Sequence, residues 1–358
     1  MRPTRATALV LATMVALAGC GATEVPAAQV TVAPDMTRAK IAPPAPVPPP
    51  APEPEPRPDP RWPLTGIRTD KVAKRPAVAV KIENSAASRP HTGLHRADIV
   101  WEQVVEGGIS RFVAVYHSDL PRRVGPVRSV RPMDPATVAP LHGILAASGG
   151  QPPFLRAVRA TGTQLLTMDD GDRGFERSSS RPAPHNVYGD VRAFARQADR
   201  RRTEPPPAQL AYAEQRADGT ARSRGKRARE ADVRLSRAQR TTWTWNGKDQ
   251  AYRRSDDGRA SMSSGKRVTA RNVLLLSVRV TSTGYRDPSG AAVPKTELVG
   301  KGEGRLLGGG RSIKVTWSKK GAKAPLRLRL ARGGEVLLEP GRTWIELVPR
   351  DDGSWRVS

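Results

Sequence analysis

Hydrophobic and polar residues alternate in the first half of the chain with the two-residue period of β-strands. The alternation is clearest at Val78, Val80 and Ile82, which are separated by Ala79 and Lys81. The predicted strands are residues 76–84, 98–105, 110–118 and, as a shorter apolar run, 141–148.

Two further segments of this half predict helices. Residues 152–161 begin with proline, which is favoured in the first turn of a helix. Residues 190–200 begin with Asp190, whose side chain suits the N-cap position.

The second half of the chain has short runs of β-branched and aromatic residues separated by glycine-rich turns, a pattern typical of a small all-β domain. We expect residues 300–304 to form a turn between strands, because no helix follows them as a dinucleotide-binding loop would require. The predicted strands lie around Trp243, Trp245 and Tyr252 and in residues 272–280, 311–318, 325–330, 335–338 and 342–348.

These patterns predict an α+β fold, in which an N-terminal α+β domain is followed by a smaller, mostly-β domain. A chain of 358 residues has room for about two domains. The predicted divisions are a signal peptide at 1–19, a lipidated, disordered and proline-rich tether at 20–61, the α+β domain at 62–204, a polar linker or extended hairpin at 205–231, the mostly-β domain at 232–350 and a tail at 351–358.

The N-terminus has the order of parts of a secretory signal, with Arg2 and Arg5 before an apolar run at residues 6–16. That run is too short to span a bilayer as a helix. The following Leu-Ala-Gly-Cys ending, at Cys20, resembles the signal of bacterial lipoproteins, whose cysteine carries a lipid. We therefore expect a palmitate-bearing protein on the outer face of the cytoplasmic membrane. An ordinary secretory signal is the alternative.

The formal net charge of +26 has three interpretations. The first is a general compositional bias towards arginine, and the second is attraction to anionic lipid headgroups or wall polymers. The third, nucleic-acid binding, is disfavoured for an exported lipoprotein. The sequence also contains no zinc-finger spacing, basic zipper or aromatic RNA-binding signature.

The first candidate site residues lie in a predicted hairpin formed by residues 98–105 and 110–118. If Gly107 and Gly108 form a two-residue turn, Arg111 shares one strand face with Glu102 and Glu106, and the opposite, aromatic face is the expected core. Arg111 then belongs either to an exposed ion pair or to a ligand site in which two acids hold it. Glu102 and Glu106 do not suit a glycosidase, since four strand residues separate them by about 13 Å.

Two loops carry further candidates. Arginine side chains suit phosphate and carboxylate because they donate two parallel hydrogen bonds, although a solvated basic loop is the alternative. A lone loop histidine also has a structural alternative. The candidates are Arg128, Ser129 and Arg131 in the first loop and His185 and Asn186 in the second.

Other kinds of site find no support in the sequence. The acidic residues 169–172 lack the length and the closing glutamate of a calcium loop. No nucleophile elbow, zinc-binding helix or phosphate loop occurs. We expect neither a metal nor a cofactor.

Several strings, among them the Glu-Gly-Gly and Gly-Pro-Val-Arg-Ser motifs, are specific in combination. They occupy residues 75–84, 89–94, 97–100, 106–112, 125–131, 185–188, 270–273 and 340–345. Together they resemble the YerB-type family of bacterial lipoproteins over nearly all of the chain after the tether.

The resemblance implies an α+β domain followed by a mostly-β domain, but no reaction, because the family is known chiefly as domains of unknown function. Family members often carry a His near residues 147–148 and a His-x-Asp near residues 260–263, and this sequence has neither. The motif positions that the resemblance supports are Glu106, Arg111, Arg128, Arg131, His185 and Asn186.

We expect a cleft in the N-terminal domain that binds an anionic envelope ligand, such as a phosphate- or carboxylate-bearing glycan or lipid precursor. One alternative is an envelope hydrolase or transferase with Glu106 or His185 as general base. Another is a module whose basic face docks an unidentified protein. The predicted binding residues are Asn84, Arg89, Glu102, Glu106, Arg111, Arg128, Ser129, Arg131, His185 and Asn186.

Overall fold

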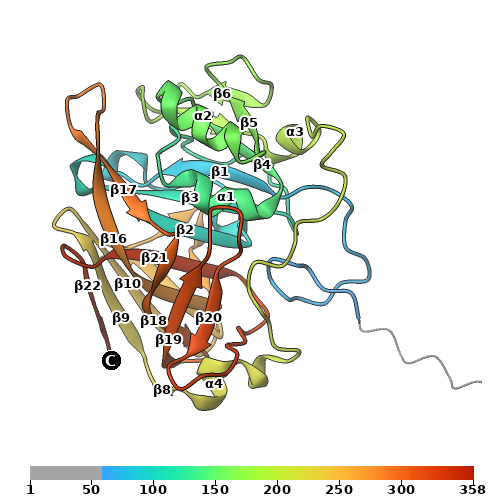
Figure 1. Cartoon of the computed structure of the whole chain (residues 1–358), viewed down its shortest axis with the longest axis vertical. Helices are drawn as coiled ribbons and strands as arrows, with labels where there is room; N and C mark the ends of the chain where they lie inside the picture. The colour runs from blue at the N-terminus through green and yellow to red at the C-terminus, as the bar shows by residue number, and fades with distance from the viewer. Residues whose placement is uncertain (1–58) are drawn as a thin grey trace, which may run out of the picture. The chain divides into compact units, whose positions relative to one another are not determined.

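The computed structural model describes residues 59–358, and two β-sheets organise this part of the chain (Figure 1). The predicted signal peptide, Cys20 and the tether up to residue 58 lie outside the described residues. None of the helices in residues 59–358 has the length and apolar character that a bilayer crossing requires.

Within the described residues, the larger sheet contains twelve strands. β17 (Ala292–Glu297) pairs with one of them, β16, and β8 (Lys226–Arg227) pairs with β19. In hydrogen-bonded order, the main path is β20 (Arg327–Leu330), β19 (Arg311–Lys319), β18 (Gly300–Gly308), β16 (Asn272–Arg286), β21 (Thr343–Pro349), β2 (Ile99–Val104), β3 (Ser110–Tyr116), β1 (Val78–Glu83), β4 (Ile144–Ala147) and β5 (Gln164–Thr167).

The smaller sheet comes entirely from the second half of the chain, with β15 (Thr269–Ala270) paired to β11. Its main path is β12 (Arg259–Ala260), β11 (Ala251–Asp256), β10 (Gln239–Asn246), β9 (Glu230–Ser236) and β22 (Ser354–Val357). The remaining strands form two pairs, β6 (Phe175–Arg177) with β7 (Val187–Gly189) and β13 (Met262–Ser263) with β14 (Lys266–Arg267).

Strand β21 joins the two halves of the chain into one large sheet. It pairs in parallel with β2 on one side and with β16 on the other, and all seven of its residues are buried. The predicted domain boundaries at residues 204 and 232 stay a prediction. The structure shows that strands from both predicted domains belong to a single sheet.

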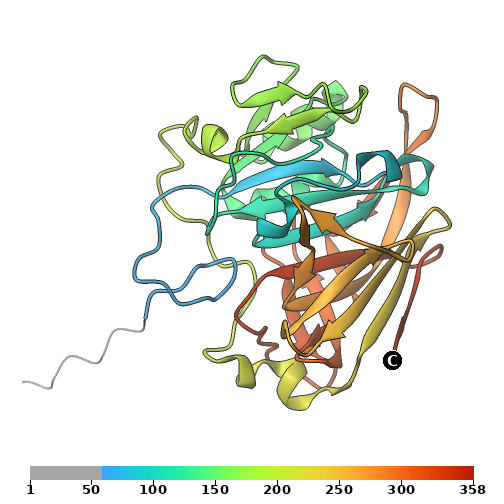
Figure 2. The same cartoon turned by 180° about the vertical axis from the view of Figure 1, so that it is seen from behind.

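Both faces of the N-terminal part of this sheet are covered (Figure 2). One face packs against α1 (Asp134–Val138) and α2 (Pro152–Ala160). The other packs against α3 (Val191–Ala195) and the smaller sheet. A fourth helix, α4 (Thr220–Arg224), contacts β18 and β19. The short 3-10 turns are η1 (Ala86–Ser88), η2 (Leu94–Arg96), η3 (Glu106–Gly108), η4 (Ala139–Leu141) and η5 (Arg216–Asp218).

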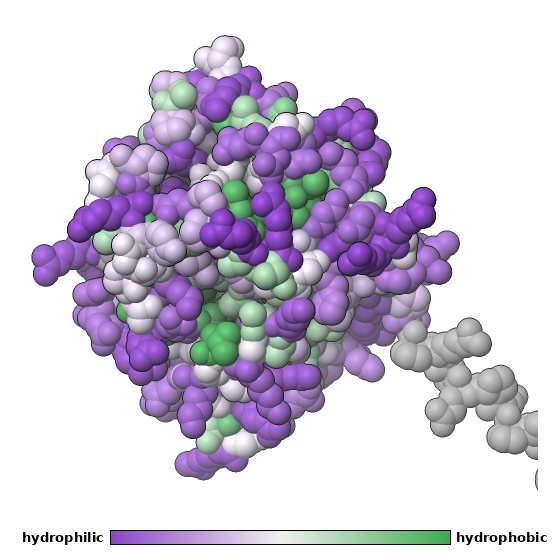
Figure 3. Space-filling model, turned by 45° about the horizontal axis from the view of Figure 1, so that its top comes forward, coloured by the Kyte–Doolittle hydropathy of each residue, from purple (hydrophilic) through white to green (hydrophobic). Residues whose placement is uncertain are grey.

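The outer surface is largely polar. Figure 3 shows one face, on which hydrophobic residues occupy only small, separate areas. Among the described residues, the large hydrophobic side chains that are exposed are Ile67, Tyr285 and Val299.

The α+β fold is confirmed, and the early strands and the helix predicted at residues 152–161, which is α2, lie where the sequence predicts them, whereas α1 was not predicted. Asp190 is also the N-cap of α3, because its carboxylate accepts hydrogen bonds from the backbone amides of Arg192 and Ala193 at 2.8 and 3.1 Å. That helix, however, ends at Ala195 rather than at residue 200.

The predicted register of the β2–β3 hairpin is wrong by one residue. Gly107 and Gly108, with φ of 68° and 73°, belong to the 3-10 turn η3, and Val104 pairs with Ser110 instead of Arg111. A shift of one residue exchanges the faces of a strand. Glu102 therefore shares a face with Phe112, and the predicted division into an aromatic core face and a mixed outer face fails because both faces are buried.

The predicted turn at residues 300–304 is also wrong, because these residues begin strand β18. A side chain at Gly302 would meet the Trp317 ring nitrogen at 2.6 Å, so the glycine there lets a tryptophan cover the strand. The predicted strand at residues 335–338 forms only isolated bridges. The predicted linker contains α4 and β8, and the predicted tail contains β22.

Candidate functional site

The register of the hairpin separates the predicted site residues into two groups on opposite faces of the sheet. Arg111 lies on the face that also carries Gln103 and Glu83, while Glu102 lies on the other face. The prediction that Glu102 and Glu106 together hold Arg111 is therefore wrong for Glu102. We call the first group the Arg111 cluster; it consists of Glu83, Glu106, Arg111, Arg128, Ser129, Arg131 and His185.

One end of the Arg111 cluster is a buried arginine–carboxylate pair. Arg131 donates from Nη2 to Glu106 Oε2 at 2.8 Å and from Nε to the second oxygen of the same carboxylate. Only 7% of Arg131 and 6% of Glu106 is exposed. Glu106 is thus occupied on both oxygens by Arg131, a geometry that suits a structural brace better than a general base.

The other end of the cluster is centred on Glu83, a buried residue at the end of β1 that the sequence analysis missed. His185 Nδ1 lies 2.9 Å from Glu83 Oε1, and Arg128 Nε lies 3.6 Å from Oε2. The hydroxyl of Ser85 donates to Oε1 at 2.8 Å. The side chains of His185 and Arg128 are 23% and 21% exposed, so this end reaches the surface.

Arg111 lies between these two ends and has few partners of its own. Its Nη1 donates to the Ser129 carbonyl oxygen at 3.3 Å, and its Nη2 lies 3.9 Å from Glu106 Oε2. Its Nε is buried and has no partner among the described residues. Burial, and then the charges of Arg131 and Arg128, lower the pKa of Arg111 to about 9.

The neighbouring charges do not compensate for Arg111. Lys81 and Asp134, both fully buried, pair with each other, and Asp134 also accepts from Gln103 at 2.6 Å. The carboxylates on this face, in Glu83, Glu106 and Asp134, are each hydrogen-bonded to a different cation or histidine. Arg111 is left as a surplus buried cation, and the chemistry that would satisfy it is an anion with acceptor oxygens.

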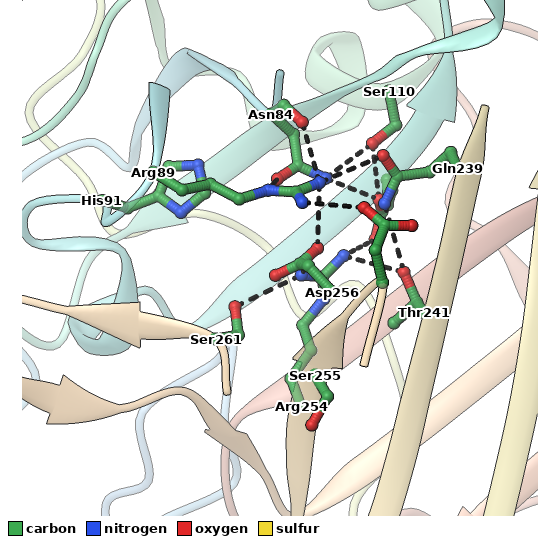
Figure 4. Close-up of polar contacts among 12 residues, drawn as sticks. Asn84, Arg89, His91, Ser110, Gln239, Thr241, Arg254, Ser255, Asp256 and Ser261 are labelled. Atoms are coloured by element: carbon green, nitrogen blue, oxygen red, sulfur yellow. Dashed lines mark hydrogen bonds and ion pairs between the residues drawn. The ribbon is translucent and has the colours of Figure 1, made fainter. Parts of the chain in front are cut away.

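The opposite face holds a largely buried polar network around Arg254, in which three more predicted residues lie, Asn84, Arg89 and Glu102 (Figure 4). Arg254 is fully buried; its Nη2 donates to Glu102 Oε2 at 2.7 Å, and its Nη1 donates to Asp256. Asn84 donates to Glu102 Oε1 at 3.1 Å and accepts from Arg89 at 3.1 Å. We call this group the Arg254 network.

The charges of the Arg254 network are well matched. Burial opposes the charge of Arg254, but the carboxylates of Asp256, Glu102 and Glu346 outweigh it and raise the pKa of the guanidinium above its ordinary value. Burial, and then the charge of Glu102, raise the pKa of Glu346 well above its usual range. Arg254 also lies over the rings of Phe112 and Trp344, at 5.2 and 5.0 Å from their centroids.

Asn186 belongs to neither group. Its side-chain oxygen accepts from Arg177 at 3.0 Å in an exposed pair. Ser129 contributes its carbonyl to Arg111, and its hydroxyl lies 3.4 Å from that of Ser148. Of the ten predicted binding residues, the Arg111 cluster unites Glu106, Arg111, Arg128, Ser129, Arg131 and His185, and the Arg254 network unites Asn84, Arg89 and Glu102.

Comparisons with known proteins agree with this architecture. The family model described as "Protein of unknown function (DUF3048) N-terminal domain" matches residues 64–204, and the model of the DUF3048 C-terminal domain matches residues 231–345. The chain belongs to the DUF3048 family.

One relative of this chain is "Putative lipoprotein YerB" of Bacillus subtilis (strain 168). The two are 27% identical over 300 residues, which cover 82% of this chain and 87% of the relative. A crystal structure of the YerB protein from Bacillus subtilis matches with a TM-score of 0.70 and 26% identity, over 83% of this chain and 99% of that chain. The resemblance to YerB-type proteins is confirmed.

The structure locates the two places where family members often carry histidines and this DUF3048 chain does not. Ser148 lies beside Ser129 at the Arg111 cluster. Residues 260–262 line a cavity of about 670 Å³ beside Arg89, His91 and Asp256 of the opposite face. Within residues 59–358, no group of three or more His, Cys, Asp or Glu side chains is arranged to hold a metal ion.

Proposed function

We propose that this DUF3048 protein is a lipid-anchored protein of the outer face of the cytoplasmic membrane that binds an anionic cell-envelope ligand at the Arg111 cluster. The ligand class is a phosphate- or carboxylate-bearing glycan or lipid precursor. The observation that carries the proposal is the incomplete pairing of Arg111, which is 4% exposed and whose one side-chain hydrogen bond within the described residues goes to a backbone carbonyl.

The cost of that incomplete pairing supports a binding role. A buried charge that lacks hydrogen-bonded partners is destabilising, so its retention is consistent with a role in binding. An anionic oxygen beside Arg111 would supply the missing acceptor. Arg128 and His185, at the exposed end of the cluster, stand where the remainder of an anionic ligand would meet the protein.

Membrane attachment rests on different support. The Leu-Ala-Gly-Cys sequence at Cys20 resembles a lipoprotein signal, and the relative YerB carries the name of a lipoprotein. Replacing the thiol in Cys20→Ser should abolish incorporation of radiolabelled fatty acid and release the protein from the membrane fraction. Equal labelling of the variant and the parent would end the lipid-anchor proposal.

The binding proposal is tested by calorimetry of the purified full chain with three probes: glucose 1-phosphate, glucuronate and inorganic phosphate. Arg111→Ala and Arg128→Ala should each weaken binding by about 1.5–3 kcal/mol, the scale of a charge-assisted hydrogen bond. The three probes separate a phosphate-binding site from a carboxylate-binding site.

Arg177→Ala is the matched control, because it removes an exposed arginine that pairs with Asn186 outside the cluster. Its affinity should equal that of the parent. If Arg111→Ala and Arg128→Ala also retain the parent affinity for every probe that binds, the proposed site is wrong.

An enzymatic role is the second candidate, and one observation favours it. Glu83 holds His185 by Nδ1, which leaves Nε2 without a partner among the described residues and in the arrangement of an oriented general base. If the protein is a hydrolase or transferase, His185→Gln should lower turnover about 10²- to 10⁴-fold while binding is retained. Product formation by the parent that His185→Gln does not reduce would exclude this residue as the base.

A further inference from the structure

A second concentration of positive charge lies at the other end of strand β3, away from the Arg111 cluster. The loop after β3, the segment around η2 and the β13–β14 hairpin enclose a groove of about 780 Å³. Arg111 lies near the start of β3, and five strand residues, about 17 Å, separate it from the end of the strand at Tyr116. We call this groove the basic groove; its basic lining residues are Arg96, Arg122, Arg123, Lys266, Arg267 and Arg342.

Most of this charge is not neutralised within the described residues. Arg96 pairs with Asp119, the acidic residue of the lining, and Arg123 pairs with Glu176 at 2.9 Å. The remaining four, Arg122, Lys266, Arg267 and Arg342, form no ion pair within residues 59–358. Arg267 donates only to the Ser255 hydroxyl and the Ser261 carbonyl.

The positive charges of the groove also affect His95. Burial, and then the charges of Lys266, Arg342 and Arg96, lower the pKa of His95, which also lines the groove. Cations gathered in a concave surface focus the field and raise the local concentration of anions. The groove therefore attracts a ligand with several negative charges.

The groove is held in shape by contacts between distant parts of the chain. The Gly93 amide donates to the Ser264 hydroxyl at 3.1 Å, and the Ser264 amide donates to the His91 carbonyl at 2.9 Å. The β13–β14 hairpin is thereby fixed to the segment before η2. The backbone from which Lys266 and Arg267 project is therefore held in place without a ligand, which lowers part of the entropic cost of binding one.

We propose that the basic groove binds a linear polymer of phosphodiester-linked polyol or sugar units, whose successive phosphates pair with Arg122, Lys266, Arg267 and Arg342. Hydroxyl groups of Thr92, Ser264 and Thr269 line the same groove and can hydrogen-bond to polyol hydroxyls. This site is separate from the Arg111 cluster, so the two proposals can fail independently.

Two other polyanions fit the groove less well. None of the lining residues is Phe, Tyr or Trp, so His95 is the one aromatic ring in the lining of the described groove on which a nucleic-acid base could stack, and successive bases would have no series of rings. None of the exposed large hydrophobic side chains of residues 59–358 lies in the groove, so nothing there would insert into a lipid surface.

The test measures binding of synthetic poly(glycerol phosphate) to the purified full chain. For a flexible chain, each phosphate contact contributes about −0.7 to the slope of log affinity against log salt, so four contacts predict a roughly 50-fold loss of affinity between about 50 and about 200 mM salt. The double variant Arg122→Ala/Arg342→Ala should weaken binding about 25-fold near 0.1 M salt and halve the salt slope.

The matched control is Lys248→Ala/Arg332→Ala, which removes two exposed cations outside the groove. If this control weakens binding as much as Arg122→Ala/Arg342→Ala, the interaction reflects net charge alone and the groove proposal is overturned. Arg111→Ala should leave poly(glycerol phosphate) binding unchanged, and loss of binding in that variant would place the polymer at the Arg111 cluster instead.

Two alternative probes decide the ligand class. A single-stranded oligonucleotide of matched charge and vesicles containing phosphatidylglycerol are titrated in parallel with the polymer. Weaker binding of both supports the proposal. Equal or tighter binding of either one, with the same loss in Arg122→Ala/Arg342→Ala, would overturn it in favour of a nucleic acid or a membrane surface.

Discussion

Two buried arginines on opposite faces of one sheet differ in how their charge is balanced. Arg254 is fully buried, donates to Glu102, Asp256, Ser261 and Thr241, and lies over two aromatic rings. Arg111 is almost as deeply buried but makes one hydrogen bond, to a backbone carbonyl. The pKa of Arg254 is raised, and that of Arg111 is lowered to about 9.

The comparison shows that burial of a charged side chain does not by itself indicate function. Arg254 connects strands β2 and β11 and balances carboxylates that would otherwise be buried alone. A network of this kind contributes to the specificity of the fold. Arg111 has surplus donors beside partly exposed Arg128 and His185, and this difference is the basis of the proposed ligand site.

The largest expected effect tests the structural half of this comparison. Arg254→Met should lower the free energy of unfolding by about 3–5 kcal/mol, because Glu102 and Asp256 would remain buried without their cation. Urea denaturation of the purified protein measures the change. If Arg254→Met does not fold, Arg254→Lys, which keeps the charge, should fold with an intermediate loss.

Glu346→Gln is the control for that variant. Because burial and Glu102 favour the protonated form of Glu346 by raising its pKa, an amide of nearly the same shape should change the free energy of unfolding by less than about 1 kcal/mol. A loss as large as that of Arg254→Met would contradict the assignment of the charges within the network.

The next effect concerns acid stability at the edge of the Arg254 network. Burial lowers the pKa of His91 to about 4; Asp256 opposes this shift, and Arg254 and Arg89 reinforce it. The unfolded chain takes up a proton below about pH 6.5, and the folded one does so only near pH 4, so stability is lost as the pH falls between these values. The loss is about 1.4 kcal/mol per pH unit, or about 3 kcal/mol in total.

His91→Gln tests this assignment, because glutamine can still donate to the Glu83 carbonyl, which His91 Nε2 contacts at 2.8 Å. Burial also lowers the pKa of His117 to about 4 and lowers the pKa of His95, so His91→Gln should reduce the slope of the parent by the share of one histidine. Denaturation curves between about pH 4 and pH 7 measure both slopes. An unchanged slope would show that His91 does not titrate as described.

Replacing Arg111 should have a smaller effect on the free energy of unfolding, and in the opposite direction to the effect of Arg254→Met. Arg111→Met removes a cation whose carboxylate neighbours already have partners, so the free energy of unfolding should stay the same or rise by about 1–2 kcal/mol. The same variant should lose affinity for anionic probes. Destabilisation on the scale of Arg254→Met would mean that Arg111 is a structural residue and would remove the contrast between the two faces.

The sequence predicts most of the elements of the N-terminal half because their patterns are local. The alternation around Val80 corresponds to β1, and the proline that opens residues 152–161 begins α2. The sequence alone could not predict the register of the β2–β3 hairpin, because two consecutive glycines fit both a two-residue turn and the 3-10 turn η3. The shift of one residue in the register determines that Glu83, and not Glu102, lies on the same face as Arg111.

The composition of the two charge groups was predictable only in part. Loop motifs indicated Arg128, Arg131 and His185. Glu83 lies within a strand, and its only signals are its place at the end of an apolar run and in the family-like string at residues 75–84. Arg254 and Asp256 come from the second half of the chain, and nothing local connects them with Glu102, which is about 150 residues away. Long-range pairing of this kind depends on β21, the strand that joins both halves into one sheet.

The smallest expected effect defines the border of the Arg111 cluster. Asn186 adjoins His185 in the sequence, but its side chain accepts from Arg177 in an exposed pair and does not contact Glu83 or Arg111. Asn186→Ala should therefore change the free energy of unfolding by less than about 0.5 kcal/mol, the usual range for an exposed polar contact. Calorimetry should find the affinity for the anionic probes unchanged, in contrast to Arg128→Ala. A loss of affinity in Asn186→Ala would extend the site along the 182–188 loop and would mean that a ligand, rather than the chain itself, brings Asn186 to the cluster.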